Sequence, residues 1–481
     1  FNFYAPLPYY IGSLIHLLGF NFIWVAKILF MLSSILSAAA MYLLAKKLFG
    51  QRAGILAATL YIYAPYRAVD MYVRGSLSET WAFIFFPLIF YSSAILAEKI
   101  NVKGVILLGL SLSGLFLTHN VTTLMFLPFL FLWWIYLIFQ QQRWKITVYF
   151  ILAFILGLGL AAFFLLPAIF ENSFIQTKYL TVGYFNFRAH FVAVKQFFSL
   201  FWGYGSSLWG LDDGLSFQVG LVNLAVLALA GVLAILHRKN RQLLGLFLFL
   251  GISFLISIFL QHNKSAFIWE AIPEMAFIQF PWRFLGITVF VTALVGGVVS
   301  AYLKGKLFPV YLILIITAII STFAYFRPKE YVKDSFFDKF LLVDSMRRGI
   351  DLTKDYLPIW VQNTEGEMFD VPRTKTGNIT VADLQRKSTS LSFSVNVASG
   401  SAIEAPIAYF PGWEVKANNQ VIPQNSPSKM GLIMFQLPQG SYKVDIKLKD
   451  TTIRSTGNII SIASILIILV LLNFRKRHLN A

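Results

Sequence analysis

The sequence predicts a polytopic α-helical membrane protein with about eleven transmembrane helices and a C-terminal extracytoplasmic β-sandwich domain. Apolar residues make up 57% of the chain and charged residues 13%, and the mean hydropathy is +0.69. Several uncharged runs approach or reach the roughly 20 residues that a helix needs to cross a bilayer. After residue 326 the long apolar runs stop and a strand-like alternation appears, which predicts the β part.

The apolar runs define the expected transmembrane helices. We expect them at 22–45, 53–66, 80–97, 103–118, 121–139, 147–169, 216–236, 243–260, 284–303, 307–326 and 458–474. The run at Tyr9–Leu18 is too short to span, so we expect an interfacial helix there. The 48 Phe and 11 Trp residues suit lipid-facing surfaces and interfacial belts.

The short loops between the runs predict the orientation. Every second loop is basic, and with the C-terminal tail these loops carry fifteen basic residues: Lys46, Lys47, Arg52, Lys99, Lys103, Arg143, Lys145, Arg238, Lys239, Arg241, Lys304, Lys306, Arg475, Lys476 and Arg477. One acid, Glu98, lies on the same face. Cytoplasmic loops are enriched in Lys and Arg. We therefore expect this face and the tail to be cytoplasmic, and the long loops and the β domain to be extracytoplasmic.

The pattern divides the chain into a transmembrane domain at 1–326, a mostly β domain at 327–457, and a final helix with a basic tail at 458–481. Apolar and polar residues alternate in 390–397 and in 441–448, as on half-buried strands. Such strands need a second sheet over their apolar face, which favours a β-sandwich over 365–453. The stretch at 335–360 is expected to be helical.

Composition also excludes several classes. The net charge of +18 does not indicate nucleic-acid binding, because the basic residues lie in short loops between apolar runs. The absence of cysteine excludes disulfides and thiolate metal sites. The chain begins at Phe1 without a basic leader, so no signal peptide is predicted. We expect at least one further helix upstream, with the first outer loop incomplete in this sequence.

The stretch Tyr66–Glu79 is the principal candidate for a functional site. It holds Arg67, Asp70, Arg74 and Glu79 between two apolar runs. Two interpretations compete: a solvated connector, or a polar site at the outer membrane surface. The mixture of charges, the flanking aromatic residues and the expected outer position favour the site.

Two further polar groups fall at outer helix ends. His119, in Thr118-His119-Asn120, suits an acid, a base or a phosphate ligand, or its turn caps the next helix. Arg283, in Phe280-Pro281-Trp282-Arg283, suits a phosphate group or anchors the helix at the interface. We expect both residues and the four charged residues of Tyr66–Glu79 to line one outer cavity.

Two other features each allow a functional and a structural interpretation. Trp413 follows a Pro411-Gly412 turn and is a candidate glycan contact; the alternative is a core aromatic. Asp212 and Asp213 are better explained by a turn, because adjacent carboxylates rarely share a metal without further ligands. The sequence shows no metal-spaced His/Asp cluster, phosphate-binding glycine loop or nucleophile elbow. No metal site is therefore predicted, and a divalent cation is left open as a cofactor.

Short motifs resemble a known family. They are Asn2-Phe3-Tyr4-Ala5-Pro6-Leu7-Pro8-Tyr9-Tyr10, Ala64-Pro65-Tyr66-Arg67, Tyr72–Glu79, Thr118-His119-Asn120 and Phe280-Pro281-Trp282-Arg283-Phe284-Leu285. Together they resemble the prokaryotic 6-pyruvoyl-tetrahydropterin synthase-related membrane proteins, although no zinc-binding histidine trio supports pterin chemistry. Tyr409-Phe410-Pro411-Gly412-Trp413 and the later Leu437-Pro438-Gln439-Gly440 resemble the tail of YfhO-type membrane proteins.

Both groups are similar in layout to the GT-C glycosyltransferases, which take a sugar from a polyprenyl-phosphate donor at the outer side of the membrane. The resemblance implies a cell-envelope glycosyltransferase whose partners are membrane lipid, that donor, and a glycan, lipid or protein acceptor. The implied site residues are Asp70, Glu79 and His119 for catalysis and Arg67, Arg74 and Arg283 for phosphate. The usual catalytic acid of these enzymes lies in the first outer loop, so it is assigned to no numbered position here.

Two other classes of function stay open. A transporter or flippase of lipid-linked glycans would favour charges at the bilayer midplane and broken helices in paired halves. The charges here gather at outer helix ends instead. A non-catalytic envelope protein would use its β domain to bind glycan or another protein. An acidic motif in the first outer loop would favour the enzyme.

Overall fold

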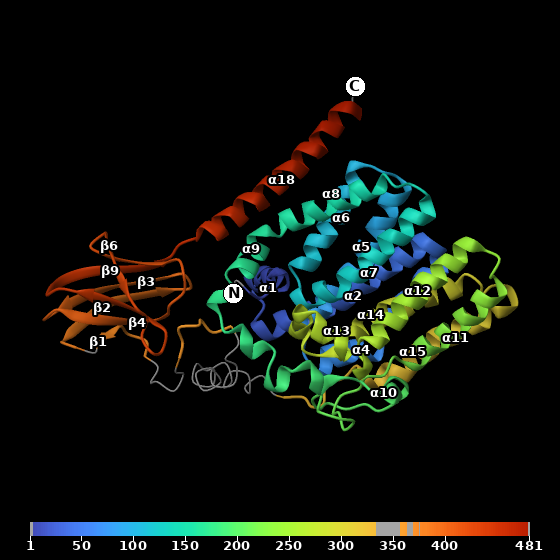
Figure 1. Ribbon diagram of the computed structural model, residues 1–481, viewed down its shortest axis with the longest axis horizontal. Helices are drawn as coiled ribbons and strands as arrows, with labels where there is room; N and C mark the ends of the chain where they lie inside the picture. The colour runs from blue at the N-terminus through green and yellow to red at the C-terminus, as the bar shows by residue number, and fades with distance from the viewer. Residues whose placement is uncertain (1–2, 333–355, 363–368, 375, 480–481) are drawn as a thin grey trace. The chain divides into compact units, whose positions relative to one another are not determined.

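The computed structural model describes residues 3–332, 356–362, 369–374 and 376–479 (Figure 1). The helix expected at 335–360 lies outside these residues except for 356–360, which are not helical. The chain forms two compact units. Unit 1 comprises Phe1–Leu165, Thr181–Tyr331 and Ile460–Ala481, and unit 2 comprises Leu166–Leu180 and Val332–Ile459.

Helices make up most of unit 1. Those described along the chain are α1 (Leu7–Leu17), α2 (Phe22–Phe49), α3 (Gln51–Ile62), α4 (Pro65–Ala68), α5 (Leu77–Glu98), α6 (Val102–Phe116), α7 (Asn120–Gln141), α8 (Ile146–Leu160), α9 (Ala162–Phe170), α10 (Val194–Phe198), α11 (Leu221–Leu236), α12 (Arg241–Phe259), α13 (Ala266–Ala271), α14 (Leu285–Ser300), α15 (Phe308–Thr322) and α18 (Thr452–Leu479). Asparagine side chains cap several N-termini: Asn21 accepts from the Trp24 amide at 2.9 Å and Asn101 from the Gly104 amide at 2.9 Å.

Among the residues that the structure describes, seven helical segments are long and apolar enough to cross a membrane: α2, α5, α7, α12, α18, Pro281–Ser300 around α14, and Gly305–Tyr325 around α15. The bent pair α8 and α9 makes an eighth if it is counted as one span, and α6 and α11 are apolar but shorter. A helix therefore lies at every predicted span. However, α3 has 12 residues and reaches about 18 Å, against roughly 30 Å of hydrocarbon. The count of eleven spans stays a prediction.

The span expected at 147–169 is broken in the structure, because α8 and α9 meet at an angle of 77°. In a continuous helix the amide of Phe163 would bond to the carbonyl of Gly159. Here the hydroxyl of Ser461 lies between them: it accepts from the Phe163 amide at 3.0 Å and donates to the Gly159 carbonyl at 3.0 Å. A side chain inserted into the hydrogen-bond ladder is a recognised cause of a sharp kink.

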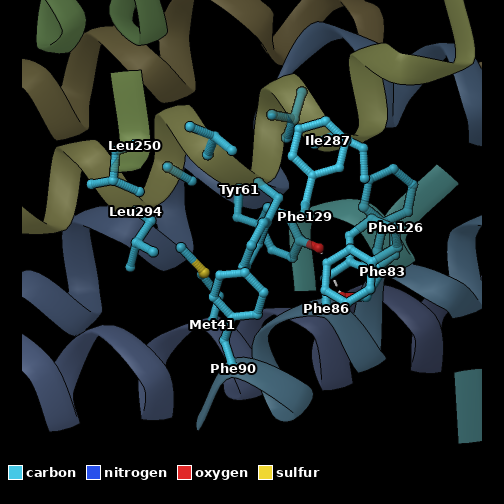
Figure 2. Close-up of a cluster of buried hydrophobic side chains, with 14 of the residues drawn as sticks. Met41, Tyr61, Phe83, Phe86, Phe90, Phe126, Phe129, Leu250, Ile287 and Leu294 are labelled. Carbon is cyan, nitrogen blue, oxygen red and sulfur yellow. Dashed lines mark hydrogen bonds between the residues drawn. The ribbon is translucent and has the colours of Figure 1, made fainter. Parts of the chain in front are cut away.

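The core of unit 1 is built around α14, all of whose residues are buried. Figure 2 shows side chains from α2, α3, α5, α7, α12 and α14 meeting in this core. Aromatic rings dominate it: Phe86 stacks on Phe126 with centroids 4.3 Å apart, and Phe90 on Trp133 at 4.8 Å. The hydroxyl of Tyr61 donates to the carbonyl of Phe83 at 2.8 Å and the indole of Trp133 to the carbonyl of Phe90 at 3.3 Å, so both polar groups are paired.

Unit 2 contains the strands. They are β1 (Arg373–Thr374), β2 (Ile379–Lys387), β3 (Ser390–Val397), β4 (Ser401–Ala408), β5 (Trp413–Ala417), β6 (Gln420–Ile422), β7 (Gln424–Asn425), β8 (Leu432–Leu437) and β9 (Gly440–Leu448). They form two antiparallel sheets with the orders β1-β4-β8-β7 and β2-β3-β9-β5-β6. Buried residues of both sheets, such as Phe393 and Phe435, belong to one hydrophobic core. The alternation at 390–397 thus corresponds to real strand burial.

Unit 2 also takes in Leu166–Leu180, a segment that we assigned to the membrane region. Backbone bonds from Gln176 to Leu357 and from Ile359 to Phe174 tie this segment to the rest of unit 2, and Glu171 adds a side-chain contact. Its carboxylate is buried and accepts from Arg454 Nη2 at 2.8 Å and from the hydroxyl of Thr451 at 2.5 Å. This buried ion pair joins the end of α9 to the start of α18.

Candidate functional site

The backbone of Tyr66–Glu79 is helical rather than a loop. Ala64 is extended, as a residue before proline prefers to be, and Pro65 opens α4 at its first position. A π-helical turn follows at Val69–Val73, a rare geometry that is frequent at functional sites. Gly75 then reverses the chain with φ +61° before α5 begins. Arg67 and Asp70 are completely enclosed as a result, which excludes a solvated connector.

Arg74 is the centre of the charged cluster. Its Nη1 contacts a carboxylate oxygen of Asp70, and it donates to Glu79 Oε2 at 2.8 Å and to the Tyr66 hydroxyl at 3.3 Å. Its guanidinium also lies over the ring of Trp282, 4.6 Å from the centroid. One cation therefore contacts two carboxylates while one face of its guanidinium lies on an aromatic ring.

Tyr66 and Trp282 are members of the site that the sequence analysis did not assign. The Tyr66 hydroxyl donates to Glu79 Oε1 at 2.6 Å, so both oxygens of Glu79 are occupied. Both aromatic residues stand directly beside predicted arginines in the motifs Tyr66-Arg67 and Trp282-Arg283. That adjacency was the available signal, but it does not show where a ring points.

Arg283 approaches the same carboxylate from a distant part of the chain. Its Nε lies 3.7 Å from Glu79 Oε2, and its Nη1 donates to the carbonyl of Ile278 at 2.8 Å. That carbonyl also accepts from the Phe280 amide at 2.7 Å across Gln279, whose φ is +67°. This is a strained γ-turn. The Arg283 side chain is 11% exposed, so it is not a lipid-facing anchor.

Arg67 is buried beside the charged cluster, but its guanidinium bonds to groups outside the cluster. Its Nη2 donates to the hydroxyl of Ser37 on α2 at 3.0 Å, and its Nη1 to the carbonyl of Thr80 at 3.4 Å. Its guanidinium lies 4.3 Å from the centroid of Phe83. The structure thus brings Arg74, Arg283, Asp70 and Glu79 into direct contact and places Arg67 against the helix bundle.

His119 stands at the start of α7 without capping it, since its side chain makes no bond to a backbone amide there. Its Nδ1 lies 2.6 Å from the Thr122 hydroxyl. Burial lowers the pKa of His119 to about 4, with Glu79 opposing the change and Arg283 and Arg74 adding to it. The imidazole is therefore neutral at physiological pH and coupled electrostatically to the cluster.

Asp70 differs from Glu79 in how fully it is paired. Only one of its carboxylate oxygens contacts Arg74, and Oδ2 has no hydrogen-bond partner in the part of the chain that the structure describes. Burial raises the pKa of Asp70 above its usual range, and the nearby Glu79 carboxylate adds to the rise. A carboxyl with a raised pKa suits proton transfer near neutral pH.

The remaining candidates lie apart from this cluster. Trp413 opens β5 in unit 2, is half-buried, and borders a groove of about 440 Å³ with Tyr409, Glu414, Gln424 and Lys449. Asp213 is buried in a turn and Asp212 is exposed beside it. Within the described ranges, no three His, Asp or Glu side chains are grouped as metal ligands would be.

The helices and the enclosed cluster define a polytopic membrane protein with a buried ionic site at helix ends. The chain belongs to the family described as 6-pyruvoyl-tetrahydropterin synthase related domain, membrane protein, which matches residues 1–328. The charged cluster lies within this match, and Trp413 lies outside it. The predicted family resemblance is therefore confirmed for the membrane region.

One relative is an uncharacterized protein of Lactococcus lactis subsp. cremoris (strain MG1363). It is 28% identical to this chain over 181 residues, which make up 36% of this chain and 29% of the relative. The match therefore covers less than a third of the relative's length.

Proposed function

We propose that this membrane protein is a glycosyltransferase that takes a sugar from a polyprenyl-phosphate donor at the extracytoplasmic face and modifies a cell-envelope glycan, lipid or protein. The charged cluster carries the proposal. Its two contacting arginines, Arg74 and Arg283, balance the two carboxylates when both acids are ionised and leave +1 when Asp70 holds a proton. The enclosed Arg67 beside them adds one more positive charge. An excess of guanidinium in a water-poor site favours a phosphate group.

The side chains of the cluster suggest a separate role for each residue in the reaction. In the transfer, the bond between the sugar's anomeric carbon and the phosphate oxygen breaks, and the acceptor oxygen bonds to that carbon. Arg74 and Arg283 would stabilise the charge that develops on the leaving phosphate, since their side chains remain 14% and 11% exposed. Asp70, whose Oδ2 has no hydrogen-bond partner among the described residues and whose pKa is raised, is the best candidate to take the acceptor's proton when it is ionised. Glu79 holds the two arginines in place.

Binding of the donor's lipid phosphate tests the site directly. We expect the protein in nanodiscs to bind polyprenyl monophosphate, measured by native mass spectrometry. Arg283→Gln should weaken this binding about tenfold to a hundredfold, because a hydrogen bond to a charged group contributes roughly 1.5–3 kcal/mol. Arg188→Gln is the matched control, since Arg188 forms an exposed ion pair with Glu270 at 2.9 Å. Equal affinities for the two variants would contradict a phosphate site at Arg283.

A second assay separates transfer from transport. Proteoliposomes receive polyprenyl phosphates that carry different radiolabelled sugars, together with envelope glycan. A transferase moves the label to the acceptor and releases polyprenyl phosphate. A flippase, which the enclosed charge of Arg67 favours as the second candidate, moves the lipid between leaflets with its sugar bond intact. Lipid binding without transfer of any label would contradict the proposed reaction.

A further inference from the structure

The segment from Val194 to Leu211 comprises α10 and the loop that follows it towards α11, and it exposes apolar side chains where a water-facing segment would expose polar ones. Its exposed large side chains are Val194, Phe198, Leu200, Phe201, Leu208, Trp209 and Leu211, with Trp209 74% and Leu200 67% exposed. Beside them, the polar side chains of Ser207 and Asp213 are buried. Exposed apolar patches of this kind mark contact with another phase or molecule.

The buried polar groups hold this arrangement in place. Asp213 Oδ1 accepts from the Ser207 hydroxyl at 3.1 Å and the Leu208 amide at 2.9 Å, and its Oδ2 accepts from Gln196 at 2.8 Å. The backbone closes beneath them, where the Gly205 amide donates to the Gly214 carbonyl at 2.8 Å. Leu208, Trp209 and Leu211 consequently lie on the outside of a closed, hydrogen-bonded turn.

The segment adjoins the ends of two apolar helices. The Val219 amide donates to the Phe197 carbonyl at 3.1 Å, and the Gln218 side chain donates to the Phe201 carbonyl at 3.3 Å. α11 begins at Leu221, which is itself exposed. The Val192 amide donates to the carbonyl of Gln261, two residues after α12 ends. The apolar patch is therefore continuous with the exposed apolar surface at the start of α11 and the end of α12.

We infer that the segment 194–211 is an interfacial loop, immersed in the headgroup and upper acyl region of the bilayer on the side where α11 begins. Lipid is the partner that fits, because the patch is continuous with helices that cross or enter the membrane. Tryptophan favours the membrane interface. The exposed charges of Lys195 and Asp212 border the apolar residues and suit the headgroup layer. This inference does not depend on the reaction proposed above.

The chain contains no cysteine, so single spin labels can measure the depth of this loop. Trp209→Cys and Leu211→Cys are labelled in proteoliposomes of phosphatidylethanolamine and phosphatidylglycerol. Collision rates with oxygen, which concentrates in lipid, are compared with those of a water-soluble nickel chelate. Ile235→Cys, exposed on α11, is the lipid-side reference, and Asn419→Cys, exposed in the turn between β5 and β6, is the aqueous reference.

We expect the labels at 209 and 211 to collide with oxygen in preference to the chelate, as at 235. Labels that match the one at 419 would overturn the inference and leave a protein partner as the occupant of the patch. Two neighbouring positions are used so that disturbance of the turn by one label does not decide the outcome. Folding of each variant is checked by its thermal unfolding midpoint.

Discussion

At the residue scale, Arg74 is the side chain on which the charged cluster depends. It contacts Asp70, Glu79 and Tyr66 at once, and it is 14% exposed. Arginine presents several donors in a rigid fork, so no other residue replaces these contacts together. Removing it would leave two carboxylates enclosed without their shared cation.

We predict that Arg74→Gln destabilises the protein by roughly 3–5 kcal/mol, because breaking a buried ion pair leaves an uncompensated charge. Unfolding in detergent, followed by circular dichroism, measures the change. Adding Glu79→Gln to this variant should restore part of the stability, since one of the two stranded charges is then removed. If Arg74→Gln is as stable as the surface variant Arg188→Gln, the cluster does not contribute to folding.

The lowered pKa of His119 predicts that the stability of the protein depends on pH. Burial lowers its pKa to about 4 in the folded protein, against about 6.5 for an unperturbed histidine. Between these values the unfolded chain binds more protons, so the free energy of unfolding decreases as the pH falls from about 6.5 towards about 4. His119→Gln should flatten this part of the stability curve relative to wild type. Parallel curves for the variant and the wild type would contradict this prediction.

At the element scale, the junction of α8 and α9 shows how one hydroxyl shapes a membrane segment. Ser461 on α18 replaces the hydrogen bond that would otherwise join Gly159 and Phe163. In a low-dielectric region these backbone groups need a partner. The kink is therefore set by a residue about 300 positions further along the chain than the helix it bends.

We predict that Ser461→Ala destabilises the protein by about 1 kcal/mol, because hydrogen bonds between membrane helices contribute roughly 0.6–1.7 kcal/mol. Ser464→Ala is the matched control, since the Ser464 hydroxyl donates to the carbonyl of Ile460 within its own helix. Thermal unfolding in the same detergent compares the two variants. Equal losses of stability in the two variants would show that the hydrogen bonds of Ser461 between helices contribute no more than the bond of Ser464 within its own helix.

At the scale of the whole molecule, the basic loops predict the orientation of the chain. The fifteen basic residues against one acid place the loops at 46–52, 99–103, 140–146, 237–242 and 304–306 and the tail after 474 in the cytoplasm. On this prediction the β domain lies on the extracytoplasmic side. Single cysteines at Asn240 and Gly400, both exposed, should react with a membrane-impermeant thiol reagent from opposite sides. Reaction from the same side would refute the orientation.

Much of the architecture was predictable because it depends on local composition. The membrane class, the positions of the helices and the C-terminal strands follow from hydrophobic runs and their period, and these predictions are confirmed. The break within 147–169 was not predictable, because hydropathy does not record an inserted hydroxyl. Hydropathy also does not fix where a helix ends: the span predicted at 53–66 corresponds to the 12-residue helix α3.

The candidate site was predictable in its members more than in its geometry. Charged residues at outer helix ends pointed to Arg67, Asp70, Arg74, Glu79 and Arg283. Their pattern did not show the π-helical turn that encloses Asp70 or the γ-turn at Gln279 that precedes Arg283. Such backbone geometries depend on packing against other segments rather than on the identity of the residues that adopt them.

The sequence by itself determined that this is a membrane protein, where its helices run and which face carries the basic loops, because each depends on residues adjacent along the chain. Only the tertiary structure decided that Arg283 meets Glu79, that Arg67 faces Ser37 instead of an acid, and that the segment 194–211 turns its apolar side chains outward. The physical reason is that ion pairs, enclosure and exposure depend on distances between segments far apart in sequence. Those distances are set by how the helices pack.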